Sequence, residues 1–175
     1  DPEMRDLELI PEIDFVSPTG DLDTVPGIFD AVVSSHVIEH QPDLAGHLNK
    51  VSARLRPGGL YLLCVPDKRY CYDYFHPESS LADVIQAAVE RRTFHTLGTV
   101  LMQTVWSAHN IPRQHWKGEH GEQRLPTAAQ LNAARAVFER SLVDNTYIDR
   151  HAWQFTPESL RYLLDRLWEM RWISL

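Results

Sequence analysis

The chain has 175 residues, of which 43% are hydrophobic and 23% are charged, and these proportions exclude a wholly disordered protein. Its 17 basic and 24 acidic residues give a net charge of −7, which argues against a broad nucleic-acid-binding surface. No apolar stretch approaches the roughly 18–20 residues that a membrane helix needs, and residues 1–5 lack the features of a secretory signal. We expect one cytoplasmic domain that neither enters a membrane nor binds nucleic acid.

The two cysteines, Cys64 and Cys71, are too few for a disulfide-rich scaffold or a four-cysteine zinc module. Both have flanks that are typical of packed structure. They are therefore expected to be reduced thiols, as in other cytosolic proteins.

The first half of the chain has the alternating pattern of an α/β fold. Residues 13–16 predict a short strand, and residues 29–34, rich in β-branched side chains, predict a strand buried on both faces. Residues 43–56 carry leucines and a valine at helical spacing. The Pro-Gly-Gly sequence at 57–59 predicts the end of that helix, and residues 60–65 predict a second buried strand. Such a strand–helix–strand unit is right-handed and produces a parallel sheet.

The second half is predicted to be mostly helical. Ser79 or Ser80 can cap a helix that continues to Arg92, and residues 97–107 predict an apolar helix. Residues 109–126 are rich in His, Gly and Pro and predict a loop.

Four further elements are predicted toward the end of the chain. Thr127 can cap a long helix, and residues 147–155 alternate enough to predict a strand. Thr156 followed by Pro157 predicts the start of a helix with leucines on one face. Residues 171–175 predict the beginning of one more strand.

Two sequence blocks carry a resemblance to a known family. The blocks FDAVVSSHVIEHQPDL (29–44) and LRPGGLYLLCVPDKRY (55–70) resemble the fourth and fifth strands of class I S-adenosylmethionine-dependent methyltransferases. The later blocks PDKRYCYDYFHPESSLAD and YIDRHAWQFTPES resemble a bacterial subgroup of these enzymes that is often found with glycan-assembly genes. The resemblance covers nearly the whole chain and implies methyl transfer from S-adenosyl-L-methionine.

The resemblance also implies an architecture. We expect an α/β fold with a Rossmann-like methyltransferase parallel sheet, incomplete at the N-terminus, in a single domain. Residues 1–78 and 146–175 would form the sheet core. Residues 79–145 would be a helical cap insertion over the carboxyl ends of the strands.

The sequence lacks two features that the family uses to bind its cofactor. The family's G-x-G-x-G loop after the first strand holds the methionine part of the cofactor by close backbone approach, and an acidic residue after the second strand binds the ribose; neither is found here. Close glycine pairs occur only at Gly58-Gly59 and at Gly118 and Gly121. The chain is therefore interpreted as beginning near the third strand and ending within the seventh, and residues 1–175 alone are expected to bind the cofactor weakly or not at all.

By resemblance, two short segments are expected to contact the cofactor. The loop after the family's third strand contacts adenine, and a carboxylate there can accept a hydrogen bond from the adenine amino group; an acidic surface turn is the alternative. The carboxyl end of the fourth strand is where open parallel sheets bind ligands. The predicted cofactor-binding residues are Gly20, Asp21, Leu22, Ser35, His36 and Val37.

A second group is expected to line the methyl-acceptor site. Asp149 and His151 alternate in a predicted strand and would point to the same face. Histidine titrates near neutral pH, so His151 can take a proton from a hydroxyl acceptor, with Asp149 and His36 as further catalytic candidates; a structural Asp–His pair is the alternative. Asp67 and Arg69, just past the 60–65 strand, are predicted to bind a polar acceptor.

The sequence His36-x-x-Glu39-His40 also matches the H-x-x-E-H pattern of zinc proteases. Zinc binding by that pattern requires both histidines on one helix face, and Pro42 leaves barely one turn of helix. A zinc hydrolase is therefore a remote alternative. The sequence predicts no metal site, with Glu39 and His40 orienting the turn over the cofactor pocket.

Another cluster of histidines, His109, His115 and His120, surrounds Trp116 in the 109–126 loop. This loop can be a substrate lid, a metal site or an ordinary surface loop.

Two classes of function remain open. The first is an enzyme that transfers a methyl group to an oxygen of a small molecule or glycan. The second is a non-catalytic methyltransferase-like interaction module that has lost cofactor binding. The intact strand blocks favour the enzyme. A strand followed by G-x-G upstream of Asp1 would decide between them.

Overall fold

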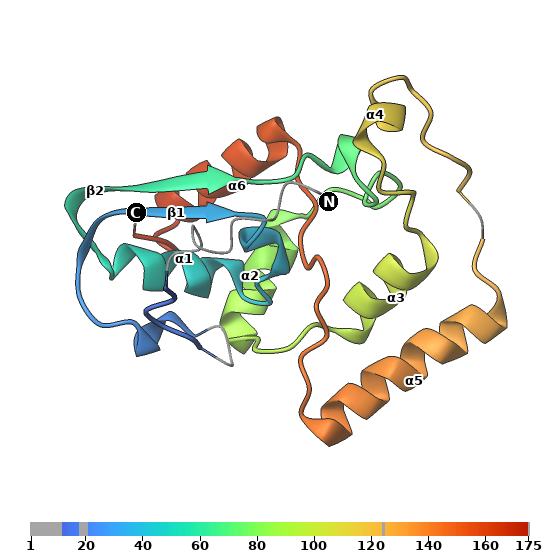
Figure 1. The fold of residues 1–175 in the computed structure, drawn as a ribbon, viewed down its shortest axis with the longest axis horizontal. Coiled ribbons are helices and arrows are strands. Elements are labelled where there is room, and N and C mark those ends of the chain that lie inside the picture. Colours follow the sequence, from blue (N-terminus) through green and yellow to red (C-terminus); the bar gives the residue numbers. More distant parts are fainter. Residues whose placement is uncertain (1–11, 18–20, 124, 175) are drawn as a thin grey trace.

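The computed structural model describes residues 12–17, 21–123 and 125–174. Strands β1 (Phe29–Ser35) and β2 (Leu55–Cys64) form a two-stranded parallel sheet and are joined through helix α1 (Leu44–Ser52). Figure 1 shows the two arrows side by side and pointing the same way, with α1 packed along them. The α/β class and the strand–helix–strand unit predicted from the sequence are confirmed.

The remaining elements are helices. Two lie close to the sheet: α2 (Leu81–Glu90) and α6 (Pro157–Glu169). Three lie on the side toward which both strands point: α3 (Leu97–Val105), α4 (Pro112–His115) and α5 (Ala128–Asp144) (Figure 1). The described residues also include three short 3₁₀ helices: η2 (Leu22–Thr24) before β1, η3 (Ile38–His40) after β1 and η4 (Lys68–Tyr70) after β2.

The helix starts follow the caps predicted from the sequence. Ser80, Thr127 and Thr156 are the N-caps of α2, α5 and α6, and each side-chain oxygen accepts a hydrogen bond from a backbone N–H of the first turn. Such a bond satisfies one of the donors that the start of a helix leaves without a partner. The caps of α5 and α6 are full capping boxes.

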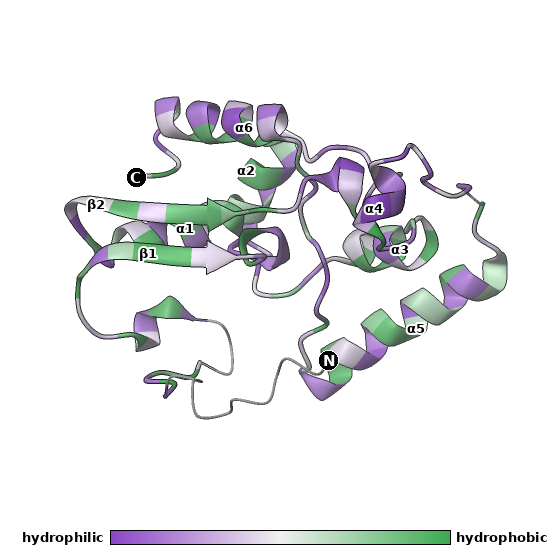
Figure 2. Cartoon of the chain, turned by 45° about the horizontal axis from the view of Figure 1, so that its top comes forward, coloured by the Kyte–Doolittle hydropathy of each residue, from purple (hydrophilic) through white to green (hydrophobic). Residues whose placement is uncertain are grey.

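One core holds α1, α2 and α6 on the same face of the sheet. Leu48 of α1, Val84 of α2 and Leu167 of α6 are fully buried in it, and Leu63 of β2 packs against them. The other face of the sheet exposes Val33, Leu60 and Leu62, and Figure 2 shows the hydrophobic colour along both strands. Helices α3 and α5 pack on each other. Thus α2 belongs with the sheet core, whereas the division into core and cap stays a prediction.

Three predicted strands are wrong. Residues 13–16 are irregular and have no pairing partner, and 171–174 form a turn held by the side chain of Asn49. Residues 147–155 make only an isolated bridge, between Asp67 and Phe155. Their backbone and side chains bond instead to residues 39–41, so no strand ladder forms.

The Pro-Gly-Gly segment lies inside β2 instead of ending a helix, because α1 already stops at Ser52. The sheet register moves from Phe29↔Leu55 to Ala31↔Leu60, so the extra β2 residues form a bulge. Gly58 has a φ of +77°, and a Cβ on Gly59 would lie 2.9 Å from the Arg56 carbonyl oxygen. The glycines therefore allow β2 to pass the bulge and stay paired with β1.

Candidate functional site at the carboxyl end of β1

The chain turns sharply where β1 ends. His36 adopts a left-handed φ of +56°, and the 3₁₀ helix η3 follows directly. This turn buries Ile38 and Glu39 and leaves His40 partly exposed. The carboxyl end of β1 thereby presents Glu39 and His40, at the edge where open parallel sheets bind ligands.

The segment 147–153 is bonded to this turn along its length. The Tyr147 hydroxyl donates to the His40 carbonyl at 2.8 Å, and the Trp153 indole donates to the Gln41 carbonyl at 2.6 Å. Between them, the Ala152 N–H donates to the Glu39 carbonyl at 2.7 Å. These bonds fix His151, one residue away, beside His40.

Two histidines in the site each lie beside a carboxylate. His151 Nδ1 donates to Asp73 Oδ2 at 2.5 Å, whereas His40 Nδ1 lies 2.7 Å from Asp149 Oδ1 without making a hydrogen bond. The two rings meet edge to face with centroids 4.6 Å apart. The bond to Asp73 fixes the orientation of the His151 ring and leaves its Nε2 nitrogen for other chemistry.

Asp73 is a buried carboxylate with two histidine neighbours. Its other oxygen, Oδ1, lies 3.2 Å from His76 Nδ1, and His76 is also buried. Burial alone would raise the pKa of Asp73, but the interactions with His151 and His76 outweigh burial and lower it below 3.8. Asp73 is therefore an anion at neutral pH and a firm anchor for His151.

Glu39 is fully buried next to the two histidines. Neither carboxylate oxygen has a hydrogen-bond partner within the described part of the chain, and His40 Nε2 lies 3.8 Å from Oε1. One possible ligand atom from each of Glu39, His40 and His151 lies within 4.8 Å of the others. These are the residue types that hold a metal ion.

His151 also lines a cleft of about 240 Å³ between the start of α2, α3 and the 151–154 segment. Because both acidic and basic side chains line the cleft, it suits a polar molecule. They include Glu78, Asp83, Arg92 and His95. Burial lowers the pKa of His95 to about 4, so this neighbour is neutral at physiological pH.

The structure separates several residues that the sequence grouped. Asp149 and His151 bind different partners, His40 and Asp73, and not each other. His36 is exposed, and its ring lies 2.9 Å from Ser35 Oγ. The strand that would align Asp149 with His151 is absent, because the segment bonds to η3 instead.

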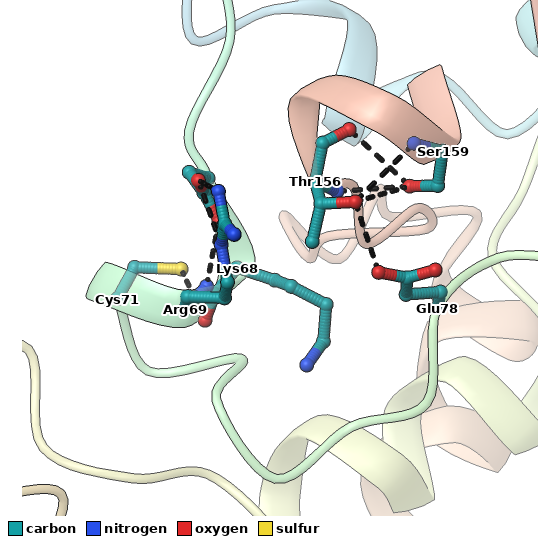
Figure 3. A network of polar contacts seen from close by, with 7 residues as sticks. Lys68, Arg69, Cys71, Glu78, Thr156 and Ser159 are labelled. Atoms are coloured by element: carbon teal, nitrogen blue, oxygen red, sulfur yellow. Dashed lines mark hydrogen bonds and ion pairs between the residues drawn. The ribbon is translucent and has the colours of Figure 1, made fainter. Parts of the chain in front are cut away.

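Asp67 and Arg69 bind each other. The Arg69 guanidinium donates to both oxygens of Asp67, with the Nη2–Oδ2 distance at 2.5 Å (Figure 3). Asp67 is also the N-cap of η4, and the ion pair occupies the groups that the sequence assigned to the acceptor. An acceptor would have to compete with this ion pair for either side chain.

The predicted adenine-binding loop is only partly described. Gly20 lies outside the described residues. Asp21 caps η2 and accepts from Lys50 Nζ at 2.6 Å, and this contact lowers the pKa of Asp21. Leu22 begins η2 and is half-buried, and Val37 is half-buried before η3.

The loop histidines bind one another and nearby aromatic rings. His115 Nδ1 lies 2.9 Å from His120 Nδ1, and the His120 ring stacks on Tyr74 with centroids 3.7 Å apart. Trp116 stacks on Tyr70 at 4.2 Å. The loop is therefore packed against the η4 region, with α4 at its centre.

Sequence reasoning missed Asp73 and His76. Both lie in the YDYF-x-P block, which was used only for the family resemblance, in a segment without helical or strand periodicity. The acidic and imidazole side chains within four residues were the one available signal. The partner of Asp73, His151, is 78 residues away along the chain, and no local pattern links Asp73 to His151.

Comparison with known proteins gives a family. A family model described as a methyltransferase domain matches residues 7–167. No curated protein and no solved structure is similar enough to count as a match. Among the described residues, no helix is both long and apolar enough to cross a membrane. The match spans most of the chain, and the parallel pairing of β1 with β2 agrees with it. The chain therefore belongs to the class I S-adenosylmethionine-dependent methyltransferases.

Proposed function

We propose that the protein transfers a methyl group from S-adenosyl-L-methionine to a hydroxyl oxygen of a small molecule or glycan. The observation that carries this proposal is the hydrogen-bonded Asp73–His151 pair, which lies beside His40 at the carboxyl end of β1. Family membership supports methyl transfer in general, and His151 lines the polar cleft. A glycan acceptor rests only on the resemblance of two sequence blocks.

The residues described here fit part of the cofactor. The sharp turn at His36 brings backbone groups to the strand edge where ligands bind, and Val37 adds an apolar side chain. When bound, the cofactor supplies a methyl group activated by a positively charged sulfur. The Gly-rich loop expected for its methionine part is not found in residues 1–175.

The proposed role of His151 is to move one proton. Its Nδ1–H donates a hydrogen bond to Asp73, so Nε2 carries the lone pair that can accept the proton of an acceptor hydroxyl. As that proton leaves, the acceptor oxygen forms the new bond to the methyl carbon, and the electrons of the broken carbon–sulfur bond remain on sulfur. Alignment of donor and acceptor supplies much of the rate, so one base is sufficient.

The test is His151→Ala in the full chain, meaning residues 1–175 together with any encoded residues that precede Asp1, with turnover and cofactor affinity measured separately. We expect turnover to fall roughly 10²-fold or more, because a general base contributes about 10²–10⁴-fold. Calorimetry should show little change in affinity for S-adenosylmethionine. His47→Gln is the matched control, since His47 is also buried but bonds to Tyr61 and not to the cluster.

Two outcomes contradict the proposal. Unchanged turnover in His151→Ala would remove the base and leave alignment as the catalytic device. If the full wild-type chain binds no S-adenosylmethionine in the same calorimetry, the protein is instead a non-catalytic methyltransferase-like interaction module.

A further inference from the structure

We propose that Glu39, His40 and His151 bind a divalent transition-metal ion. One ligand atom from each residue lies within 4.8 Å of the others. Metal–ligand distances to nitrogen and carboxylate oxygen are about 2.0–2.2 Å. Small side-chain rotations are therefore enough to bring all three ligand atoms around one ion.

The burial of Glu39 is the second, independent observation. A buried carboxylate is costly unless it is paired or hydrogen-bonded. Glu39 is fully buried, yet neither of its oxygens has a hydrogen-bond partner among the residues that the structure describes. A cation at this position satisfies both oxygens.

The carboxylates behind the histidines give the arrangement of a metal site. Metal-binding histidines almost always donate their other N–H to a carboxylate, a carbonyl or water, which fixes the ring and its tautomer. Asp73 accepts from His151 Nδ1 at 2.5 Å in this way, which leaves Nε2 of His151 as the ligand nitrogen. Asp149 lies 2.7 Å from His40 Nδ1 but makes no hydrogen bond with it, so His40 is the less firmly oriented ligand.

The ligand types indicate the class of metal. Two imidazoles and one carboxylate suit zinc and neighbouring first-row metals, whereas calcium and magnesium prefer sites made of oxygen. Three protein ligands leave at least one coordination position open. Of the three ligands, His151 also lines the polar cleft, so a molecule bound there would lie beside the site.

This site differs from the H-x-x-E-H pattern of zinc proteases. His36 has a left-handed backbone, and η3 contains only Ile38–His40, so His36 and His40 do not share a helix. The third ligand comes instead from His151, which the 147–153 segment brings to the turn.

The ion would act on the acceptor that we propose for methyl transfer. A hydroxyl oxygen bound at the open position loses its proton more readily, because the positive charge stabilises the oxyanion. In the metal-loaded protein His151 Nε2 would be a ligand and not a base, so the ion would replace His151 as the group that activates the acceptor oxygen, and the hydroxyl proton would pass to solvent. This role rests on the proposed function, whereas the metal site does not.

The experiment is a calorimetric titration of Zn²⁺ into the purified full chain after its treatment with a chelator. We expect one ion per chain. Glu39→Gln, His40→Gln and His151→Gln should each weaken Zn²⁺ binding by more than about 100-fold, because even loss of the carboxylate behind a ligating histidine costs about 10–100-fold. Asp73→Asn should weaken Zn²⁺ binding by about 10–100-fold. His36→Asn, which keeps a residue tolerant of the left-handed turn, should bind Zn²⁺ like the wild type.

Folding is followed separately in the chelated proteins. Glu39→Gln removes a buried carboxylate that has no partner, so its thermal midpoint without metal should not fall below the wild type. The Zn²⁺-induced rise of that midpoint, present in the wild type, should be lost in this variant.

Equal Zn²⁺ affinity in the wild type and all three ligand variants would overturn the proposal, as would a wild type that binds no Zn²⁺. A loss of binding in His36→Asn and His40→Gln, but not in His151→Gln, would move the site to the protease-like pattern and also overturn the proposal. Since Zn²⁺ binding is measured without cofactor or acceptor, its failure is separate from failure of methyl transfer.

Discussion

His47 shows how a single buried ring can link stability to pH. It lies on α1 with 9% of its surface exposed, and its Nε2 is 3.2 Å from the Tyr61 hydroxyl. Burial, with a smaller contribution from the charge of Lys50, lowers the pKa of His47 to about 4 from 6.5. Between these values the unfolded chain binds a proton that the folded chain does not, so stability is lost as the pH falls from 6.5 toward 4.

We predict that His47→Gln reduces the loss of stability in mild acid. Between pH 7 and pH 5 the His47 contribution amounts to about 2 kcal/mol of unfolding free energy. Urea unfolding at both values should show the variant losing less stability than the wild type by that order. His95, whose pKa is also about 4, remains in both proteins and keeps part of the pH dependence. Parallel losses in wild type and variant would contradict the assignment to His47.

At the level of single residues, the sequence predicted which residues lie near the site better than it predicted their contacts. His151 and Asp149 lie there, but their partners are Asp73 and His40. Side-chain pairing across long sequence separations depends on how loops pack, and neither periodicity nor spacing contains that information. Glu39 was predicted to orient a turn, and only its burial without a partner indicates more.

Among the structural elements, helices were predicted best because their signals are local. A cap and the first turn lie within four residues of one another, and the caps of α2, α5 and α6 are where the sequence predicted them. Strands need partners elsewhere in the chain. Residues 147–155 alternate like a strand but bond to η3, and the Pro-Gly-Gly sequence became a bulge because β1 offered β2 a partner on both sides of it.

Thr156 provides a test at this level. Its hydroxyl accepts from the Ser159 N–H at the start of α6 and donates to Glu78 Oε1 at 2.9 Å, as Figure 3 shows. Thr156→Ala should lower the unfolding free energy by about 1–2 kcal/mol, since it removes an N-cap that is buried and bonded twice. Thr156→Ser keeps the hydroxyl and should lose less than half of that. Urea unfolding of both variants measures the difference, and equal losses would assign the effect to the methyl group instead.

For the molecule as a whole, the C-terminal end of the described chain is joined to helix α1 by the side chains of Asn49 and Ser52. Asn49 of α1 donates to the Trp172 carbonyl at 2.8 Å, and its own carbonyl oxygen accepts from the Ser174 N–H at 3.0 Å. These bonds hold the turn after α6 against α1. They give the amide of Asn49 both a donor and an acceptor role.

We predict that Asn49→Ala lowers the unfolding free energy by about 1–3 kcal/mol, because the Trp172 and Ser174 groups lose their partner. Asn49→Asp is the matched control, since a carboxylate can accept from Ser174 but cannot donate to Trp172. Its loss should fall between those of the wild type and Asn49→Ala. Chemical denaturation read by the combined fluorescence of the five tryptophans measures the loss, and an unchanged midpoint in Asn49→Ala would contradict the prediction.

The residues of the candidate site are far apart in the sequence, and this separation determines when the site can form during synthesis. His151 meets Asp73 across 78 residues, and Trp153 meets Gln41 across 112. Chains fold as they are synthesised, beginning with their N-terminal parts. A growing chain can pair β1 with β2 early, but it has no complete cluster until residue 153 has left the ribosome. The residues of the candidate site can therefore come together only after β1 and β2 have had time to pair.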